Sequence, residues 1–297
     1  MSKDDLFQKL NGESIRCLAC NHYCRISQGK TGICGVRQNR MGELRLLVDN
    51  KVASLNIDPI EKKPLYHFLP GTKIMSFGTY GCNFRCSFCQ NFDISQSVKD
   101  AEKQNDQDKI IDYGQKITSE EIVDLTLKNK LPSIAYTYNE PTVFCEFALR
   151  TMKLARKAHL KNVWVSNGFM SKETLRLILP YLDAVNLDLK SFSDRFYLKI
   201  CGGRLKPVLN NIESLFEAGV HLELTTLLIP GLNDSETELK QMADFIKSLS
   251  PKIPWHLSRF FPSYQMLDRL PTALSSLKKT EEIGKKAGLK YIYLGNI

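Results

Sequence analysis

The sequence predicts an α/β protein whose parallel sheet forms a full barrel, a partial barrel or an open sheet, preceded by a small cysteine-rich segment. From Lys73 onward, short apolar strand segments alternate with amphipathic helix segments. This alternation is typical of parallel strands joined by crossover helices. In addition, seven of the nine cysteines gather in two groups, and the first group lies before the alternating region. The length of 297 residues suits one large α/β domain with a small addition, or two domains.

Composition excludes several classes of protein. Apolar residues make up 43% of the chain and charged residues 25%, which excludes a disordered or collagen-like chain. No apolar run approaches the roughly 18 residues of a membrane helix, and the first residues show no signal peptide. We therefore expect a cytoplasmic protein with no membrane contact, in which cysteines are metal ligands, catalytic groups or buried thiols rather than disulfides. The net charge of +9 suggests nucleic acid or an acidic partner.

The elements follow one another in regular order. Strands are predicted at residues 73–80, 133–138, 162–166, 184–189, 221–229, 255–261 and 291–294. Helices are predicted at 118–130, 142–159, 171–182, 207–218, 234–249 and 272–287. The first of these helices opens on Thr118-Ser119-Glu120-Glu121, which is an N-cap signature. The polar stretch 98–117 is expected to be an exposed, mobile excursion.

Unusual polar groups stand where the strands end. They are Tyr80-Gly81-Cys82, Tyr138-Asn139-Glu140, Ser166-Asn167-Gly168, Asp188-Leu189-Lys190, Thr225-Thr226 and Arg259. Reactive groups of parallel α/β proteins sit at the carboxyl ends of strands. The sequence therefore predicts that these side chains share one site.

The three-cysteine loop, Gly81–Asn91, carries Cys82-x3-Cys86-x2-Cys89. Thiolates are soft ligands that suit iron–sulfur clusters and zinc. A closed site of either kind uses four protein ligands, so three thiols on an iron–sulfur cubane would leave one iron free to bind another molecule. Phe88 is placed to shield the site. The alternative is a zinc site completed by a distant histidine.

The four-cysteine site, Cys17-x2-Cys20-x3-Cys24-x9-Cys34, offers enough thiols to close a metal site. Its short, glycine-rich segment is too small for a core of its own and needs a metal as a staple. Zinc and a second iron–sulfur cluster are both compatible with the spacing, and four reduced cysteines are the alternative. We expect a structural role, with a metal-binding segment at 1–45, a linker at 46–72 and the barrel at 73–297.

The loop motif, with an aromatic residue before its third cysteine and a strand before its first, resembles the radical S-adenosylmethionine (SAM) superfamily. The resemblance implies a partial (β/α)6-type TIM barrel and a [4Fe-4S] cluster on Cys82, Cys86 and Cys89. It also implies that the open iron binds SAM, and that one electron converts SAM to methionine and a 5′-deoxyadenosyl radical. That radical abstracts hydrogen from a substrate.

Further motifs resemble the activating enzymes of glycyl-radical enzymes, the relatives of pyruvate formate-lyase activating enzyme. Asn139-Glu140-Pro141 stands where that group often has Gly-Gly-Glu, with Tyr138 and Asn139 in place of the glycines. The resemblance implies SAM contacts from Phe88, Asn139, Glu140, Asn167, Asp188, Lys190 and, in place of a usual histidine, Arg259 or His256. The plainer alternatives are that Asp188 and Lys190 form a simple ion pair and that Glu140 caps a helix.

Both cysteine groups together, with the linker at 58–71, are similar to the radical SAM member of the AmmeMemoRadiSam system. This implies an AMMECR-domain protein and a Memo-like protein as partners, beside a reductant such as flavodoxin or ferredoxin. The linker residues Glu61, Lys62, Lys63 and His67 are expected to form a lip over the radical site, with a solvated connection as the alternative. Cys145 is expected in the core, and Cys201 is not expected to reach the site.

Three functions are compared. The first is hydrogen abstraction from a protein backbone, as in a glycyl-radical activating enzyme. The second is radical modification of a small molecule or nucleotide. The third is a zinc-bound scaffold without catalysis that binds nucleic acid, which we disfavour because the chain lacks an aromatic and basic recognition motif.

Overall fold

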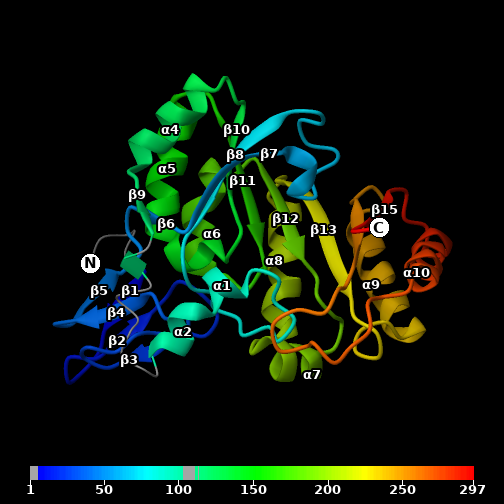
Figure 1. Cartoon of the computed structure of the whole chain (residues 1–297), viewed down its shortest axis with the longest axis horizontal. Coiled ribbons are helices and arrows are strands. Elements are labelled where there is room, and N and C mark those ends of the chain that lie inside the picture. Colours follow the sequence, from blue (N-terminus) through cyan, green and yellow to red (C-terminus); the bar gives the residue numbers. More distant parts are fainter. Residues whose placement is uncertain (1–5, 103–110, 113) are drawn as a thin grey trace.

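The computed structural model describes residues 6–102, 111–112 and 114–297. Its centre is an eight-stranded sheet in the order β15-β14-β13-β12-β11-β10-β8-β7. All neighbours in this sheet run parallel except β7, which pairs antiparallel with β8. Each parallel strand lies beside the next one along the chain, so the sheet winds in one direction and curves into an open barrel (Figure 1). This confirms the predicted α/β class.

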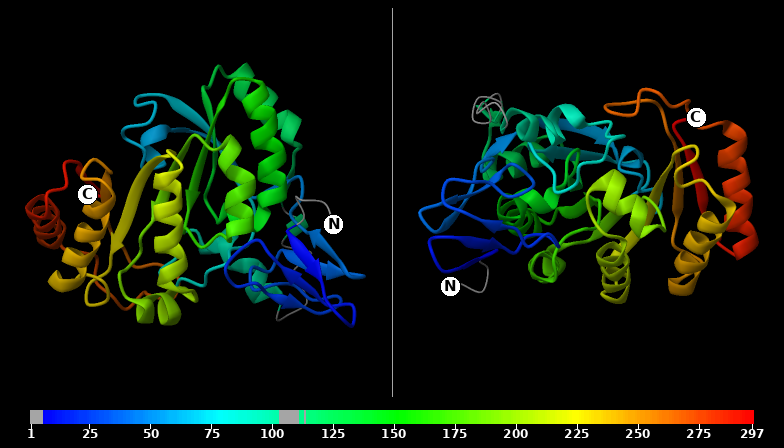
Figure 2. Two further views of the ribbon diagram at one scale, coloured as in Figure 1. Left: turned by 180° about the vertical axis from the view of Figure 1, so that it is seen from behind. Right: turned by 90° about the horizontal axis from the view of Figure 1, so that it is seen from below.

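Helices cover the outer face of this sheet (Figure 2). The strands are β7 (Ser54–Pro59), β8 (Lys73–Gly78), β10 (Ser133–Tyr136), β11 (Lys161–Ser166), β12 (Ala184–Asp188), β13 (His221–Leu228), β14 (Trp255–Arg259) and β15 (Ile292–Gly295). The longer helices are α4 (Ser119–Lys128), α5 (Cys145–Lys157), α6 (Lys172–Ile178), α8 (Leu205–Glu217), α9 (Glu236–Leu249) and α10 (Leu274–Ala287). Shorter turns are η1 (Ile60–Lys62), α1 (Phe92–Ser95), α2 (Ser97–Glu102), η2 (Pro141–Phe144), η3 (Leu179–Tyr181), α7 (Asp194–Phe196) and η4 (Tyr197–Cys201).

The amino-terminal residues form two small sheets at the end of the molecule opposite α10 (Figure 2). One sheet has the order β1-β2-β3, and the other pairs β4 with β5. Their bounds are β1 (Phe7–Lys9), β2 (Ile15–Cys17), β3 (Arg25–Ile26), β4 (Arg37–Arg40) and β5 (Glu43–Leu46), while β6 (Lys51–Val52) pairs with β9 (Gln115–Lys116). The predicted division at residues 45 and 72 stays a prediction.

The segment 60–72 fills the amino-terminal mouth of the barrel. Ile60 and Leu65 are fully buried against the first halves of the strands, where they form one apolar cluster with Ile74, Ala135, Val163 and Ala184. The backbone amides of Tyr66 and His67 donate to the Glu223 carboxylate on β13 at 3.0 and 2.8 Å. This segment is therefore a packed plug, and not the solvated connection that we weighed as an alternative.

The stretch 98–117 is not wholly exposed, which corrects our expectation. Val98 and Lys99 are buried in α2, and Ile111 and Ile117 are also buried. Apolar and aliphatic side-chain atoms are thus removed from water in a stretch that looks polar on average. Residues 103–110 and 113 of the predicted excursion lie outside the described residues. In the described part of the chain, no helix is long and apolar enough to cross a membrane.

Candidate active site

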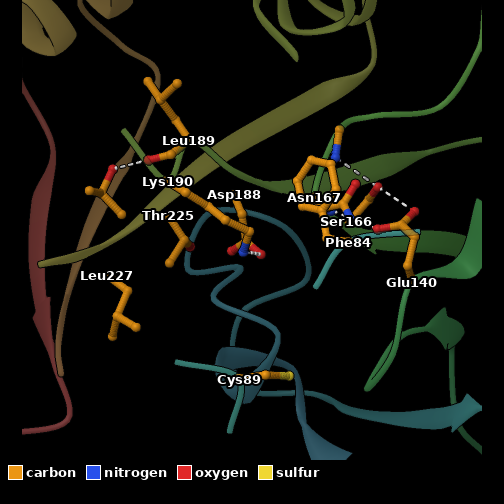
Figure 3. Close-up of polar contacts among 12 residues, drawn as sticks. Phe84, Cys89, Glu140, Ser166, Asn167, Asp188, Leu189, Lys190, Thr225 and Leu227 are labelled. Carbon is orange, nitrogen blue, oxygen red and sulfur yellow. Dashed lines mark hydrogen bonds and ion pairs between the residues drawn. The ribbon is translucent and has the colours of Figure 1, made fainter. Parts of the chain in front are cut away.

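A cavity of about 420 Å³ opens at the carboxyl ends of the parallel strands. Its wall includes nearly all the residues that the sequence predicted to bind the loop's metal or SAM: Cys82, Cys86, Phe88, Cys89, Asn139, Glu140, Asn167, Asp188 and Lys190. Figure 3 shows how Glu140 with Ser166 and Asn167, and Asp188 with Lys190, come from the ends of successive strands, with Cys89 on the loop that faces them. The expected gathering of strand-end groups is present.

The three-cysteine loop is held from outside by η4. The amide of Arg85 donates to the carbonyl of Cys201 at 2.7 Å, and the amide of Ser87 donates to that of Ile200 at 3.2 Å. This pairing brings the Cys201 thiol into hydrogen-bond contact with the thiol of Cys86. Cys201 does not line the cavity, as expected, but the sequence did not predict its contact with Cys86, which is set by backbone bonds between segments far apart in sequence. Cys145 is buried in the core as expected.

The thiols of the loop are protonated in the absence of a ligand. Burial raises the pKa of Cys82 and of Cys89. The pKa of Cys86 is raised by the hydrogen bond to Cys201 and then by burial. Because a metal binds the thiolate, loading this site releases protons and is favoured by higher pH.

Glu140 is buried and its carboxylate is fully engaged. One oxygen accepts from the amide of Thr142 at 3.1 Å and from the hydroxyl of Ser166 at 2.8 Å, and the other accepts from the amide of Asn167 at 2.8 Å. Burial raises its pKa, and these hydrogen bonds act in the opposite direction. The side chain caps η2, as the plainer alternative held, and it also ties the end of β10 to the end of β11. Contact with SAM stays a prediction for this residue.

Two asparagines fix the three-cysteine loop. The Asn139 side chain donates to the carbonyl of Gly81 at 2.7 Å and accepts from the amide of Thr79 at 3.1 Å. The Asn167 side chain donates to Asn83 Oδ1 at 2.7 Å and lies 3.9 Å from the Cys82 sulfur. Both residues therefore position the loop relative to the strand ends.

Asp188 and Lys190 form an ion pair at the cavity wall, with 2.6 Å between Nζ and Oδ2. Burial lowers the pKa of Lys190, but the charge and hydrogen bond of Asp188, together with the nearby Cys86 and Cys201, raise it overall. The Lys190 ammonium also lies over the Phe88 ring, 5.8 Å from its centre. This ammonium is thus a permanent cation beside the three thiols.

The sixth strand does not bring its predicted residues to the cavity. Arg259 donates to the carbonyl of Thr272 at 2.7 Å and lies over the Phe261 ring, outside the cavity wall. His256 binds the Glu223 carboxylate at 2.7 Å near the start of β14. The neighbouring Ser258 lines the cavity instead.

Sequence reasoning named Tyr138 and Lys63 separately, but it missed that they form one polar group with Asp58 on the cavity wall. Tyr138 has φ +68°, a left-handed conformation that usually requires glycine. Its hydroxyl donates to Asp58 at 2.6 Å, and burial raises its pKa to about 12. Lys63 completes the group, 2.7 Å from the same carboxylate oxygen and 4.4 Å from the centre of the Tyr138 ring. In the sequence, the one feature that could have indicated this group is the tyrosine at position 138, where the related motif has glycine.

The predicted lip is only partly formed. Lys62 and Lys63 line the cavity together with Asp58. Glu61 instead accepts from the amide of Gly71 at 2.7 Å, and His67 bonds the Tyr293 hydroxyl at 2.6 Å. Two of the four residues therefore face the site and two stabilise the plug.

The four-cysteine site lies directly behind the three-cysteine loop. Cys17, Cys20, Cys24 and Cys34 line one small cavity, with Arg37 and Asn83 also in its wall. The buried Arg37 donates to the Cys17 sulfur at 3.2 Å and holds Glu146 through two further bonds. Burial raises the pKa of Cys34 to about 11. The thiols are gathered as predicted, and the identity of a metal there stays a proposal.

The chemistry of the residues around both cysteine groups fits anionic metal–thiolate centres. Lys99 is buried, and its ammonium bonds the carbonyl of Phe84 at 2.5 Å and Gln96 Oε1 at 3.0 Å. Among the described residues it forms no ion pair with a carboxylate. A buried cation requires a compensating charge, and thiolates at Cys82 and Cys34 would supply it. The three-cysteine loop therefore fits a [4Fe-4S] cluster.

The fold and the site define a parallel α/β barrel enzyme with a three-thiol cofactor site at its carboxyl edge. A match to the radical SAM superfamily covers residues 77–246. The chain belongs to this superfamily, and its relatives place it near the activating enzymes of glycyl-radical enzymes.

Three comparisons illustrate this placement. The chain is 40% identical over 292 residues to the uncharacterized protein MJ0808 of Methanocaldococcus jannaschii, covering 98% of this chain and 84% of the relative. It is 23% identical to the pyruvate formate-lyase-activating enzyme of Clostridium pasteurianum, over 61% of this chain and 71% of that enzyme. The structure of a radical SAM methyltransferase from Sphaerobacter thermophilus shares the fold, with a TM-score of 0.55 and 15% identity over 76% of this chain and 67% of that one.

Proposed function

We propose that this enzyme binds a [4Fe-4S] cluster on Cys82, Cys86 and Cys89, cleaves SAM reductively and abstracts hydrogen from a substrate. The observation that carries the proposal is that three thiols of one loop meet strand-end polar groups in one cavity of about 420 Å³. When bound, the cluster supplies one electron to SAM, which breaks into methionine and a 5′-deoxyadenosyl radical.

The residues of this chain bind and position the reacting molecules. We assign the Lys190 ammonium to the carboxylate of SAM, because it is the permanent cation at the wall, and Asp188 to its amino group. Glu140, Asn139 and Asn167 act as positioning residues, since their bonds fix the strand ends and the loop. Phe88 is buried beside Lys190 and shields the site from water.

The substrate that we propose is a glycine in a protein segment. The support comes from relatives named as activating enzymes, and from the size of the cavity, which suits one drug-sized ligand such as SAM and leaves the substrate to approach from the rim. A flavodoxin or ferredoxin is the proposed electron donor, and the cytoplasm the proposed location. Membership of the AmmeMemoRadiSam system, with its AMMECR-domain and Memo-like partners, remains a prediction.

The test of cleavage uses protein reconstituted anaerobically with iron and sulfide and reduced with dithionite. We expect SAM to give methionine and 5′-deoxyadenosine in equal amounts. Cys86→Ala should lose the cluster absorbance and at least 100-fold of the cleavage rate. Cys145→Ala removes a buried thiol outside the loop and should keep both. Protein that binds zinc alone and leaves SAM intact would contradict the proposal.

The test of substrate class follows the hydrogen atom. A glycine-containing peptide labelled with deuterium at the α-carbon should pass deuterium into 5′-deoxyadenosine. The same peptide with the label on a neighbouring side chain is the control. Transfer from neither peptide, but from a small molecule or nucleotide, would replace the protein substrate.

A further inference from the structure

We propose that Lys63 and Lys62 bind a carboxylate of the substrate, so that the target glycine stands beside an acidic residue. The inference rests on the proposed function, because it takes the cavity at the strand ends as the place where SAM and the substrate meet. It goes further by naming a charge that the substrate carries. The two lysines belong to one polar group with Asp58 and Tyr138, here called the lysine group, to which the proposed function gives no role.

The lysine group shares its cavity with the three thiols, since all four of its members line the wall. Tyr138 joins the group to the three-cysteine loop. Its carbonyl accepts from the Asn91 side chain at 2.7 Å, and its hydroxyl donates to Asp58 at 2.6 Å. A molecule bound at the lysine group therefore lies next to the loop that carries the thiols, with one tyrosine between them.

Lys63 keeps hydrogen-bonding capacity at the cavity wall. Its side chain is only 4% exposed, although it lines the cavity. An ammonium group has three N–H donors. Across the part of the chain that the structure describes, one oxygen accepts from it, Asp58 Oδ2 at 2.7 Å, and the centre of the Tyr138 ring lies 4.4 Å away. At least one donor is therefore left for a ligand.

The charges of the lysine group do not balance. Asp58 supplies one negative charge, and its Oδ2 atom is shared by the Lys63 ammonium and the Tyr138 hydroxyl. Lys62 adds a second positive charge, with its ammonium 3.7 Å from Asp58 Oδ1 and its side chain 71% exposed. Burial lowers the pKa of Lys63, and although Asp58 opposes this, the charge of Lys62 adds to it. A further anion at this place would therefore be stabilised.

SAM does not supply that anion. Its carboxylate is assigned to Lys190, the cation beside the three thiols, which follows β12. Lys63 instead lies in the plug of residues 60–72, and the adenosine and sulfonium parts of SAM carry no negative charge. The anion that matches the lysine group therefore comes from the other molecule in the cavity, which is the substrate.

The size of the excess charge selects a carboxylate. Two ammonium groups and one carboxylate leave one positive charge, and one further carboxylate neutralises it. A phosphate group carries about −1.5 to −2 charges at neutral pH and would leave negative charge beside Asp58. Arginine is the residue that binds phosphate in the bidentate manner, and among the described residues no arginine lines this cavity. In a protein segment, the matching group is the side chain of an aspartate or a glutamate.

The backbone of Tyr138 supports a functional role for the group. Its φ of +68° is left-handed, a conformation that a side chain opposes. Residues held in such conformations gather at active sites and ligand sites. Here the conformation places in the cavity wall the ring and the hydroxyl that hold Lys63 and Asp58.

The first experiment measures binding without turnover. The probes are two capped peptides, acetyl-Asp-Gly-Asp-amide and acetyl-Asn-Gly-Asn-amide, which differ in charge and hardly in size. Isothermal titration calorimetry on the oxidised holoenzyme with SAM should show about tenfold tighter binding of the aspartate peptide, as expected for a hydrogen bond between charged groups. Equal binding of the two peptides, or binding of neither, would overturn the inference. Tighter binding of the matching phosphoserine peptide would overturn the choice of a carboxylate.

The second experiment assigns the preference to the lysine group. Lys63→Met should lose about tenfold in affinity for the aspartate peptide and keep the wild-type affinity for the asparagine peptide. Lys63→Arg should restore most of the preference. Lys73→Met is the matched control, because Lys73 is exposed and lies outside the cavity wall. A merely structural role of Lys63 would weaken both peptides alike, and that result would overturn the inference.

Lys62→Met keeps the inference testable if Lys63→Met fails to fold. This change removes the excess charge from an exposed side chain and leaves the ion pair of Lys63 with Asp58 intact. It should weaken binding of the aspartate peptide by about threefold, as for an exposed ion pair, without an effect on the asparagine peptide. An unchanged preference in this variant would overturn the role of the excess charge.

The third experiment separates failure of the inference from failure of the proposed function. Both peptides carry deuterium on the α-carbon of glycine and are given to the reduced holoenzyme with SAM. Deuterium should enter 5′-deoxyadenosine about tenfold faster from the aspartate peptide, in line with its tighter binding. Equal transfer from the two peptides would overturn the inference and leave the proposed function standing. Preferential binding of the aspartate peptide by a holoenzyme that leaves SAM intact would overturn the proposed function and leave the carboxylate site standing.

Discussion

At the scale of single residues, the site depends on left-handed backbone at strand ends. Gly81 and Gly168 have φ +85° and +73°, and Tyr138 has φ +68°. A non-glycine residue pays about 1–2 kcal/mol for this conformation. The hydrogen bond of Tyr138 to Asp58 and the cation–π contact of its ring with Lys63 offset that cost. The backbone turn of a glycine motif is therefore kept while a polar ring is added to the cavity wall.

Of the two glycines, Gly81 leaves less room for a side chain than Gly168 does. In Gly81→Ala the added Cβ meets the carbonyl oxygen of Cys34 at 2.6 Å and the Val36 side chain at 2.8 Å. We expect the conformational cost of about 1–2 kcal/mol and about 1–3 kcal/mol more for overpacking, with reduced iron content. Urea unfolding and iron analysis measure both effects.

Gly219→Ala is the matched control for that prediction. Gly219 has a similar φ of +73°, but nothing lies within 4 Å of its added Cβ. It should show the conformational cost alone and full iron content. Equal stability of the two variants would show that the approach of Gly81 to the four-cysteine site is unimportant.

At the scale of elements, α4 shows how local sequence sets a boundary. The Thr118 hydroxyl accepts from the amide of Glu121 at 3.2 Å, and the Glu121 carboxylate accepts from the amide of Thr118 at 2.7 Å. Both bonds satisfy amides that the first helical turn leaves free. This reciprocal pair is the predicted capping box.

Thr118→Ala should remove one of these bonds and destabilise the protein by about 1 kcal/mol. Thr118→Ser keeps the hydroxyl and should lose much less. The free energy of unfolding in urea gives the comparison. Equal losses in the two variants would assign the effect to the methyl group of threonine rather than to the cap.

The parallel strands and their helices could be predicted because their apolar periodicity is strong and local. The antiparallel strand β7 and the strands β1 to β5 could not, because they have two to six residues and little alternation. The partner of β7 lies further along the chain, with Ser54 opposite Gly78, whereas β1 to β5 pair with their neighbours in short antiparallel sheets. Tertiary pairing, and not local preference, decides such elements.

The same distinction holds for the site. The cysteines and the strand-end groups could be predicted, since spacing and topology place them. The full engagement of Glu140, the approach of Cys201 to Cys86 and the burial of Lys99 could not, because each depends on packing between separate segments. Arg259 was misplaced for the same reason, as its partner Thr272 lies on the next loop.

At the scale of the whole molecule, Glu223 joins the plug to the barrel. Its side chain is fully buried and binds His221 and His256 at 2.9 and 2.7 Å, beside the amides of Tyr66 and His67. Burial opposes its ionisation, but the hydrogen bonds from these groups outweigh it and lower its pKa to about 2.

This lowered pKa predicts a specific acid sensitivity. An unfolded glutamate has a pKa of about 4.3, so the Glu223 carboxylate stabilises the fold above that pH by about 3 kcal/mol, and the contribution is lost as pH falls towards 2. Glu223→Gln should therefore be less stable than wild type at pH 6, and the gap should narrow below pH 4. Urea unfolding of both proteins between pH 6 and 3 checks this, and a constant gap would contradict it.

The plug of residues 60–72 has a consequence for turnover. Among the described residues, Ile60 and Leu65 fill the amino-terminal mouth, and the cavity that holds the candidate site opens at the carboxyl ends of the strands. In a SAM-cleaving enzyme of this shape, methionine and 5′-deoxyadenosine have to depart through the passage by which the next SAM arrives. For the proposed reaction, we therefore predict that accumulated 5′-deoxyadenosine competes with SAM for this cavity.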